Sequence, residues 1–165
     1  MNFPDPSDNQ AVFNFVVNHL RQQKLQSTDD PTGGCVYKSK DGTSCAVGCL
    51  IPEEEYTSSF EGEPLNRYLE DVVNDTNEIT HWVHNKGYDS RLLCELQWLH
   101  DDNDNWGCSF EYSDLRPPLN WIKEDAIMRY ADELKLTYVP LSYDTIDPAE
   151  RQFYSPSDPT AKEPQ

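Results

Sequence analysis

Three cysteines in the first third of the chain are the first candidates for chemistry. Cys35, Cys45 and Cys49 fall within 15 residues, and the last two are separated by three residues, a spacing that zinc sites use. A fourth ligand would come from Cys94, Cys108 or a histidine. No second close pair of cysteines follows, and free cysteines are commonly buried as small apolar side chains. The pattern therefore leaves a core role, which it favours, and a zinc site as the alternative.

A histidine and an aspartate stand next to each other at the end of the most apolar helical segment. His100-Asp101 has the form found in phosphohydrolases that hold a metal ion with two histidines and two aspartates, and His81, His84 and Asp114 are the further candidates. Those enzymes are bundles of long helices, whereas this sequence also predicts strands. In the competing interpretation, His100 borders an apolar helical face and caps the last carbonyl groups of the helix. The candidate metal ligands are Cys35, Cys45, Cys49, His100 and Asp101.

Motifs for other reactions are absent from the sequence. It contains no G-x-S-x-G nucleophile elbow and no glycine-rich phosphate loop of the GxxxxGK[ST] or GxGxxG type. The acidic stretch 101–105 fails as a calcium loop, because Trp106 and Tyr112 stand where an EF-hand needs glycine and glutamate. We therefore expect a protein without catalytic residues and without a cofactor. A metal-dependent or thiol enzyme is one alternative. A protein that sequesters a small ligand in a pocket of aromatic side chains is another.

Charge is the strongest global feature of the chain. Its 165 residues include 30 acidic and 13 basic side chains, a formal net charge of −17. Residues 1–50 hold five acids and four bases, so the remaining 25 acids and nine bases give residues 51–165 a net charge of −16. Such a protein lacks the basic surface that nucleic acids and anionic membranes attract. Clustered carboxylates could instead occupy the basic groove of a nucleic-acid-binding protein, although charge that only maintains solubility is the competing interpretation.

The candidate carboxylates for such a surface form three clusters along the chain. They are Glu53, Glu54, Glu55, Glu61 and Glu63, then Glu70, Asp71, Asp75 and Glu78, and finally Asp101, Asp102 and Asp104.

Apolar spacing and turn residues predict an α+β fold, a small antiparallel hairpin with three to five helices packed on it. The first helix is expected over 8–23, opened by the capping box Ser7-x-x-Gln10. Strands over 34–38 and 44–51 flank an Asp41-Gly42 turn. Pro64 and the pattern after Asp75 predict two short helices.

The second half of the chain continues this pattern. A leucine-striped helix follows, capped by Asp89 or Ser90, with Trp98 offset from the stripe and partly exposed. A short strand is expected over 108–112, then a helix capped by Asn120 and an extended segment over 136–141. We expect one globular domain over 1–142 and an extended C-terminal tail over 143–165, where proline, serine and acidic residues replace the apolar periodicity.

Two sequence blocks carry a family resemblance. The C-x-Y element at Cys35, the segment CAVGCLIPEEEY and the segment LLCELQWLHDD, followed by a tryptophan-containing turn and a short helix, occur in this order over about residues 10–136. This combination resembles small uncharacterised proteins encoded in bacteriophage genomes. The resemblance implies a phage-derived protein that acts in the cytoplasm of an infected cell. It implies no catalytic residue, and the acidic connection and the tail are elaborations of this chain.

Together these observations predict an acidic binding protein. Its expected partner is a host protein with a basic, nucleic-acid-binding surface that the acidic face blocks, as a DNA mimic or an inhibitor of host defence does. The sequence predicts no direct contact with nucleic acid or membrane.

Overall fold

The computed structural model describes residues 2–28, 35–62, 65, 77–109 and 119–141. Within these residues lie four α-helices and one two-stranded antiparallel sheet, which confirms the predicted α+β class. The helices are α1 (Asn9–Gln23), α2 (Glu78–Lys86), α3 (Ser90–Asp101) and α4 (Glu124–Leu134), and the strands are β1 (Trp106–Ser109) and β2 (Leu119–Ile122). Short 3-10 turns are η1 (Gly48–Leu50), η2 (Ser58–Phe60) and η4 (Asn103–Asn105).

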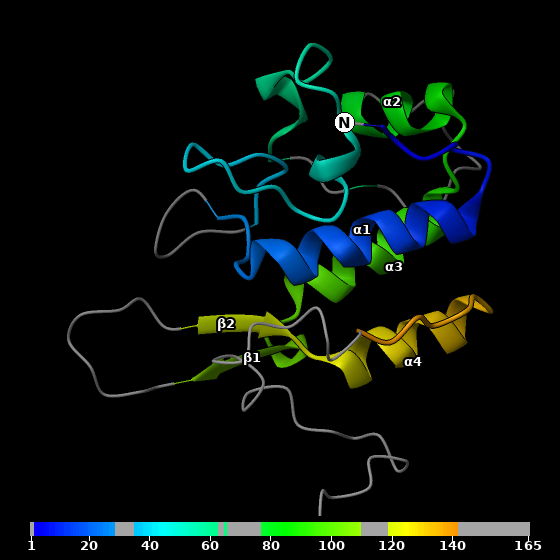
Figure 1. Ribbon diagram of the computed structural model, residues 1–165. Helices are drawn as coiled ribbons and strands as arrows, with labels where there is room; N and C mark the ends of the chain where they lie inside the picture. Colours follow the sequence, from blue (N-terminus) through cyan, green and yellow to red (C-terminus); the bar gives the residue numbers. More distant parts are fainter. Residues whose placement is uncertain (1, 29–34, 63–64, 66–76, 110–118, 142–165) are drawn as a thin grey trace, which may run out of the picture.

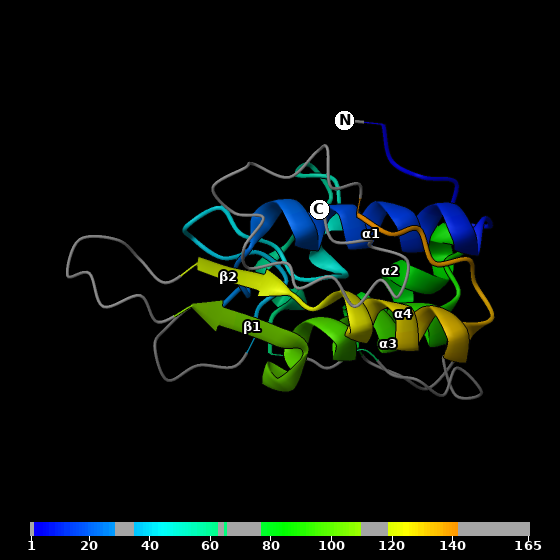
Figure 2. The ribbon, with the colours of Figure 1, turned by 60° about the horizontal axis from the view of Figure 1, so that its bottom comes forward.

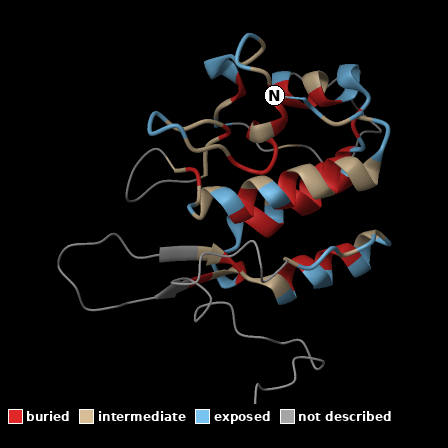
Figure 3. Cartoon of the chain, viewed as in Figure 1, coloured by how far each residue is buried: buried red, intermediate tan, exposed pale blue. Residues whose placement is uncertain are grey.

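Helix α3 is the centre of the hydrophobic core. The predicted stripe of Leu92, Leu93, Leu96 and Leu99 is fully buried, because α3 contacts each of the other three helices. Figures 1 and 2 show α1 and α4 running along α3, with the sheet at one end of this helical layer. Burial concentrates on the sides of the helices that face one another (Figure 3). The leucine spacing therefore predicted the core of the molecule correctly.

The helix boundaries are set by side chains that accept the first free backbone N–H groups. Helix α1 begins after Asp8, whose carboxylate accepts the Ala11 N–H at 3.0 Å, so the predicted capping box at Ser7 is wrong. Helix α3 begins after Asp89, one of its two predicted caps, and that carboxylate accepts two N–H groups. Asn77 caps α2, and Gly87, with φ of 82°, ends it.

The predicted hairpin over 34–51 has its turn but not its strands. Gly42 has φ of 83° in the turn, and a single bridge joins Lys38 to Ser44. Instead of continuing as a strand over 44–51, the chain coils into η1 and buries its apolar side chains. The coil passes so close to Tyr37 that a Cβ on Gly48 would lie 1.7 Å from the Tyr37 carbonyl oxygen. A buried apolar run has the same composition in a strand and in a coil, so sequence could not distinguish them.

The β-hairpin of this fold lies later in the chain. Strands β1 and β2 pair antiparallel, with Gly107 opposite Trp121, and the indole packs where a Gly107 side chain would stand. Asn120 belongs to β2 and does not cap a helix, and α4 begins after Lys123. Strand β1 begins at Trp106 and includes the first two residues of the strand expected over 108–112, while residues 110–112 lie outside the described residues.

The segment after α4 returns along α1, as Figure 2 shows for the orange part of the chain. Thr137 exchanges two hydrogen bonds with the Gln10 side chain, and the Val139 carbonyl accepts one from Arg21. Arg21 also forms an ion pair with Glu124 at 2.5 Å, with both partners largely buried. These contacts connect the expected extended segment over 136–141 to the first helix.

Buried side chains from all four helices form one hydrophobic core among the described residues. The expected tail over 143–165 and the helix expected after Pro64 lie outside the described residues. None of the helices in the described part of the chain has the length and apolarity that a membrane crossing requires.

Candidate functional site

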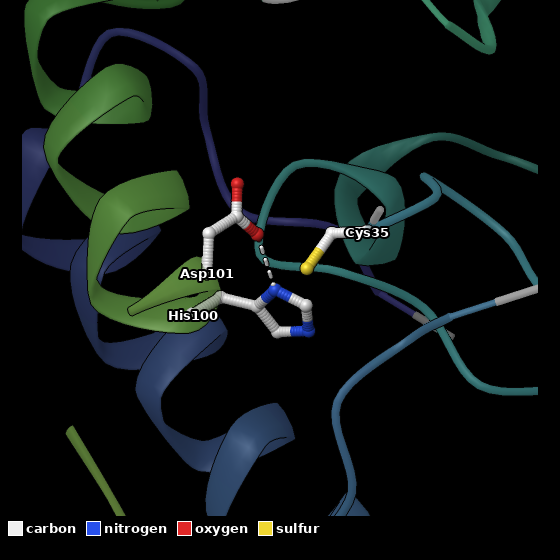
Figure 4. Close-up of side chains that lie close together, drawn as sticks. All are labelled: Cys35, His100 and Asp101. Atoms are coloured by element: carbon white, nitrogen blue, oxygen red, sulfur yellow. Dashed lines mark hydrogen bonds and ion pairs between the residues drawn. The ribbon is translucent and has the colours of Figure 1, made fainter. Parts of the chain in front are cut away.

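Cys35, His100 and Asp101 meet at the C-terminal end of α3. Cys35 comes from the loop that precedes the Asp41-Gly42 turn, and His100 and Asp101 are the last residues of the helix. One donor atom of each lies within 4.8 Å of the other two, the only such group of three among the described residues (Figure 4). The structure thus brings together three of the five predicted metal ligands, from segments that are 65 positions apart in the sequence.

The hydrogen bonds of His100 fix the tautomer of its buried ring. The backbone N–H of Ser27 donates to Nε2 at 3.1 Å, so Nε2 must offer a lone pair and carry no proton. The ring proton of the neutral imidazole then lies on Nδ1, which donates to Asp101 Oδ1 at 2.7 Å. Both ring nitrogens therefore make hydrogen bonds, one to Ser27 and one to Asp101. Neither bonds to the last carbonyl groups of the helix, which is the role that the sequence predicted.

This tautomer disfavours both a metal site and a thiol nucleophile, the two functions that the cluster suggests. A metal ion needs a lone pair on the histidine nitrogen, and Nδ1 facing Cys35 and Asp101 carries a proton instead. Moving that proton to Nε2 would place it against the Ser27 N–H. A thiol nucleophile needs histidine as its base, yet Asp101 bonds to both His100 and Cys35. The arrangement is that of a closed hydrogen-bond network.

The protonation of the thiol agrees with this network. Burial, together with hydrogen bonding and charge repulsion from Asp101, raises the pKa of Cys35 to about 12. A reactive cysteine needs the opposite shift, because the thiolate is the nucleophile and the metal ligand. Burial also acts to raise the pKa of Asp101, but hydrogen bonds from His100, Cys35 and Gln97 outweigh it and lower that pKa. Asp101 is therefore the ionised member of the cluster.

The other predicted ligands lie apart from this group. Cys45 is fully buried, and its Sγ accepts the Gly48 N–H, while the Cys49 thiol donates to the Ala46 carbonyl. Burial raises the pKa of both thiols. His81 and His84 lie on α2 and do not join the cluster, and Asp114 lies outside the described residues. The core role that the cysteine spacing favoured describes Cys45.

Two of the predicted surface carboxylates hold the fold together. Glu61 accepts the backbone N–H groups of Tyr37 and Lys38 on its two oxygens, and also the Tyr56 hydroxyl. Glu55 accepts hydrogen bonds from the Trp82 indole and from Lys86. Since these carboxylates have partners within the fold, they contribute less to a binding surface than their charge suggests.

The remaining predicted carboxylates divide between the described surface and the rest of the chain. Glu54 and Asp104 are exposed, Glu53 is exposed and pairs with Lys38, Glu78 accepts from Ser59, and Asp102 caps η4. The members that lie outside the described residues are Glu63, Glu70, Asp71 and Asp75.

A shallow hollow opens on the surface beside the cluster. It has a volume of about 380 Å³ and is lined by Trp98 and the two aspartates at the end of α3, with Tyr130 of α4 on its other side. The Trp98 side chain is 52% exposed, in agreement with its predicted offset from the leucine stripe. Sequence reasoning did not connect Trp98 with Tyr130, because the residues of α4 gave no sign of which helix they contact.

Comparison of the chain with protein families, with curated proteins and with solved structures finds no match.

Proposed function

We propose that this protein is an acidic, non-enzymatic binding factor that covers a basic, nucleic-acid-binding site of a host protein. The observation that carries the proposal is the net charge of −16 concentrated in residues 51–165. Carboxylates from three separate segments are exposed on the described surface, at Glu54, Glu78 and Asp104. A surface of this charge attracts proteins that have a positive groove and repels nucleic acids.

The candidate active site supports a role without catalysis. The protons on Cys35 and on His100 Nδ1 both lie toward Asp101, and the Ser27 N–H occupies Nε2. This network connects the loop at Ser27, the loop at Cys35 and the end of α3. Its chemistry is that of a structural polar cluster, in which every buried donor has an acceptor.

The phage setting is part of the proposal. The resemblance of the CAVGCLIPEEEY and LLCELQWLHDD blocks to phage-encoded proteins favours a role in the cytoplasm of an infected bacterium. There a protein that occupies the nucleic-acid groove of a defence nuclease or a transcription regulator would act as a competitive inhibitor. The negative charge alone indicates the class of partner, which is a protein with a strongly basic groove.

A capture experiment with a nucleic-acid competitor tests the proposal. The immobilised protein is incubated with bacterial lysate at low salt, and bound proteins are eluted either with increasing NaCl or with duplex DNA. We expect one or a few basic nucleic-acid-binding proteins, released by both treatments, because DNA and this protein compete for one groove. The matched control is a variant in which Glu54, Glu78 and Asp104 are replaced by their amides, and it should retain less of the same partner.

Two results would contradict the proposal. The first is the absence of any captured protein at low ionic strength. The second is a captured partner that neither salt nor DNA displaces, because its binding would then be neither electrostatic nor competitive with nucleic acid.

A further inference from the structure

Another hollow lies where three helix ends meet, at the end of the helical layer opposite the sheet. Helices α1 and α3 begin there and α4 ends there, as Figures 1 and 2 show. The hollow has a volume of about 280 Å³, and Leu92, Leu134 and Leu136 lie in its walls together with charged residues. Pockets for drug-sized ligands span about 300–1,000 Å³, so this hollow suits a smaller molecule with an apolar part.

One wall of this hollow includes an arginine without a partner. Among the arginine and lysine residues that the structure describes, Arg91 is the one whose side chain has no ion pair, hydrogen bond or ring contact. By contrast, Arg21 bonds to Glu124, and Arg129 bonds to Asn105. An unpaired guanidinium is unexpected in a chain with 30 acidic and 13 basic side chains. It offers a planar fork of N–H donors to an anionic group of a ligand.

The wall formed by the end of α4 includes an acidic residue without a partner. Within the described part of the chain, the Glu133 carboxylate has no hydrogen bond and no ion pair. The neighbouring Lys135 already lies 4.0 Å from Asp132. Asp89, which also lines the hollow, caps α3 with one oxygen and accepts the Asn9 amide with the other. The charges that the fold leaves unpaired are therefore one guanidinium and one carboxylate.

Both unpaired charges lie at helix ends that disfavour them. Arg91 is the second residue of α3, where the backbone dipoles make the helix end positive, and Glu133 lies in the last turn of α4, where they make it negative. Helix α2 has the favourable order, with Glu78 in its first turn and Lys86 in its last. Residues that contradict a local preference are expected mainly at functional sites.

We propose that this hollow binds a free α-amino acid with an apolar side chain. The carboxylate of the ligand accepts hydrogen bonds from Arg91 at the positive end of α3, and its ammonium group donates to Glu133 at the negative end of α4. Its side chain packs on the leucines of the walls. A zwitterion fits better than a phosphate, because the net charge of −17 repels an anion but not a molecule without net charge. The inference is independent of the proposed function, since no basic protein takes part in it.

Four small molecules test the three parts of this contact. L-leucine, N-acetyl-L-leucine, L-leucinamide and glycine are titrated into the ¹⁵N-labelled full-length protein, and the backbone N–H signals of Arg91 and Glu133 are followed by NMR. We expect L-leucine to shift both signals to saturation, with a Kd of about 1 mM or lower. The other three lack the ammonium group, the carboxylate and the side chain, respectively, and each should bind at least about threefold more weakly.

Variants of the two unpaired residues separate this site from general electrostatic attraction. Arg91→Gln should weaken leucine binding about fivefold to thirtyfold, because two charge-assisted hydrogen bonds are lost, and Arg91→Lys should recover part of the affinity. Glu133→Gln should weaken it about twofold to fivefold, as loss of one exposed ion pair does. Glu54→Gln is the matched control, since it removes the same charge from an exposed residue that does not line the hollow, and it should leave the affinity unchanged.

Thermal unfolding of the same variants shows whether the two residues act on the ligand or on the fold. Arg91→Gln and Glu133→Gln should unfold at the temperature of the unaltered protein or slightly above it, because each removes an unpaired charge from a helix end that disfavours it. Weaker leucine binding by a variant that unfolds at a clearly lower temperature would therefore count against a direct contact.

Three further outcomes would overturn the inference. The first is the absence of a saturable shift with L-leucine up to about 20 mM, since a weaker site would not be specific. The second is equal affinity for L-leucine and N-acetyl-L-leucine, which would show that the ammonium group is not recognised. The third is equal affinity of Arg91→Gln and Glu54→Gln for L-leucine. None of these outcomes bears on capture of a basic protein, so the proposed function stands or fails separately.

Discussion

At the scale of single residues, the structure ties one cysteine and one histidine, the two most reactive side-chain types in this chain, to the same aspartate. Cys35 shares Asp101 with His100, and the ring of His100 is completely buried. The His100 carbonyl accepts two further hydrogen bonds, from the side chains of Gln26 and Trp106. His100 therefore connects α3 to the loop after α1 and to β1. Its two ring nitrogens and its carbonyl oxygen all make hydrogen bonds within the fold.

Loss of the His100 ring nitrogens should destabilise the protein. In His100→Phe the volume is retained, but the Ser27 N–H and Asp101 Oδ1 lose a buried partner, which costs about 2–4 kcal/mol in the free energy of unfolding. Urea denaturation at pH 7 measures this difference. His84→Phe is the matched control, since His84 is exposed on α2 and its loss should change stability by less than about 0.5 kcal/mol. A His100→Phe protein as stable as the control would show that the network contributes nothing.

The Cys35 thiol should react slowly. With a pKa raised to about 12, from an ordinary value of 9.0, its thiolate fraction at pH 8 falls roughly a thousandfold. Labelling with iodoacetamide at pH 8, followed by peptide mass spectrometry, should therefore modify Cys35 far more slowly in the folded protein than in 8 M urea. Rapid labelling of the folded protein at Cys35 would instead indicate an activated thiol and revive the enzymatic alternative.

At the scale of elements, the sequence predicted α3 correctly but predicted a strand where the chain coils at η1. The leucine stripe of α3 repeats at helical spacing, and Asp89 precedes it as a cap, so local sequence determined both its position and its buried face. In contrast, the 44–51 segment has small and apolar side chains without a period that distinguishes strand from coil. Its backbone packs against Tyr37, whose carbonyl oxygen accepts the Cys45 N–H and lies close to Gly48.

The close contact at η1 predicts a position that tolerates no side chain. In Gly48→Ala the new Cβ would meet the Tyr37 carbonyl, a backbone group that cannot rotate away, so we expect a loss of about 3 kcal/mol or more in the free energy of unfolding. Gly42→Ala is the control, because Gly42 has φ of 83° but open space around it, and backbone strain alone costs about 1 kcal/mol. Thermal and urea unfolding of both variants should show this order, and the reverse order would contradict the contact.

At the scale of the whole molecule, the acidic composition and the packed core have separate origins. Of the predicted surface carboxylates, Glu55 and Glu61 are bonded within the fold, Glu78 is exposed but accepts a hydrogen bond from Ser59, and Glu54 and Asp104 are exposed. Net charge could be read from the sequence, but the carboxylates available to a partner could not. Each internal pairing joins residues that are between five and 31 positions apart, which no local pattern encodes.

The buried thiols and phenols predict the alkaline limit of stability. Burial raises the pKa values of Cys35 and Tyr88 to about 12, and raises those of Cys45 and Tyr37 as well. The unfolded chain, with ordinary values of 9.0 for cysteine and 10.0 for tyrosine, releases these protons at lower pH than the folded chain does. Stability from these groups is therefore complete below about pH 9 and is lost as pH rises toward 12.

Urea denaturation at a series of pH values between 7 and 12 tests this expectation. The free energy of unfolding should be level up to about pH 9 and then fall steadily. A constant free energy across the series would contradict the burial of these groups.

The sequence by itself determined the position of α3, the leucine core, the exposure of Trp98 and the concentration of charge after residue 50, because periodicity and composition are local properties. It also indicated Cys35, His100 and Asp101, but as members of a larger set. Only the tertiary structure selected these three and bonded the Ser27 N–H to the imidazole. Those outcomes depend on which loops pack against the end of α3, and such long-range contacts arise from the whole fold.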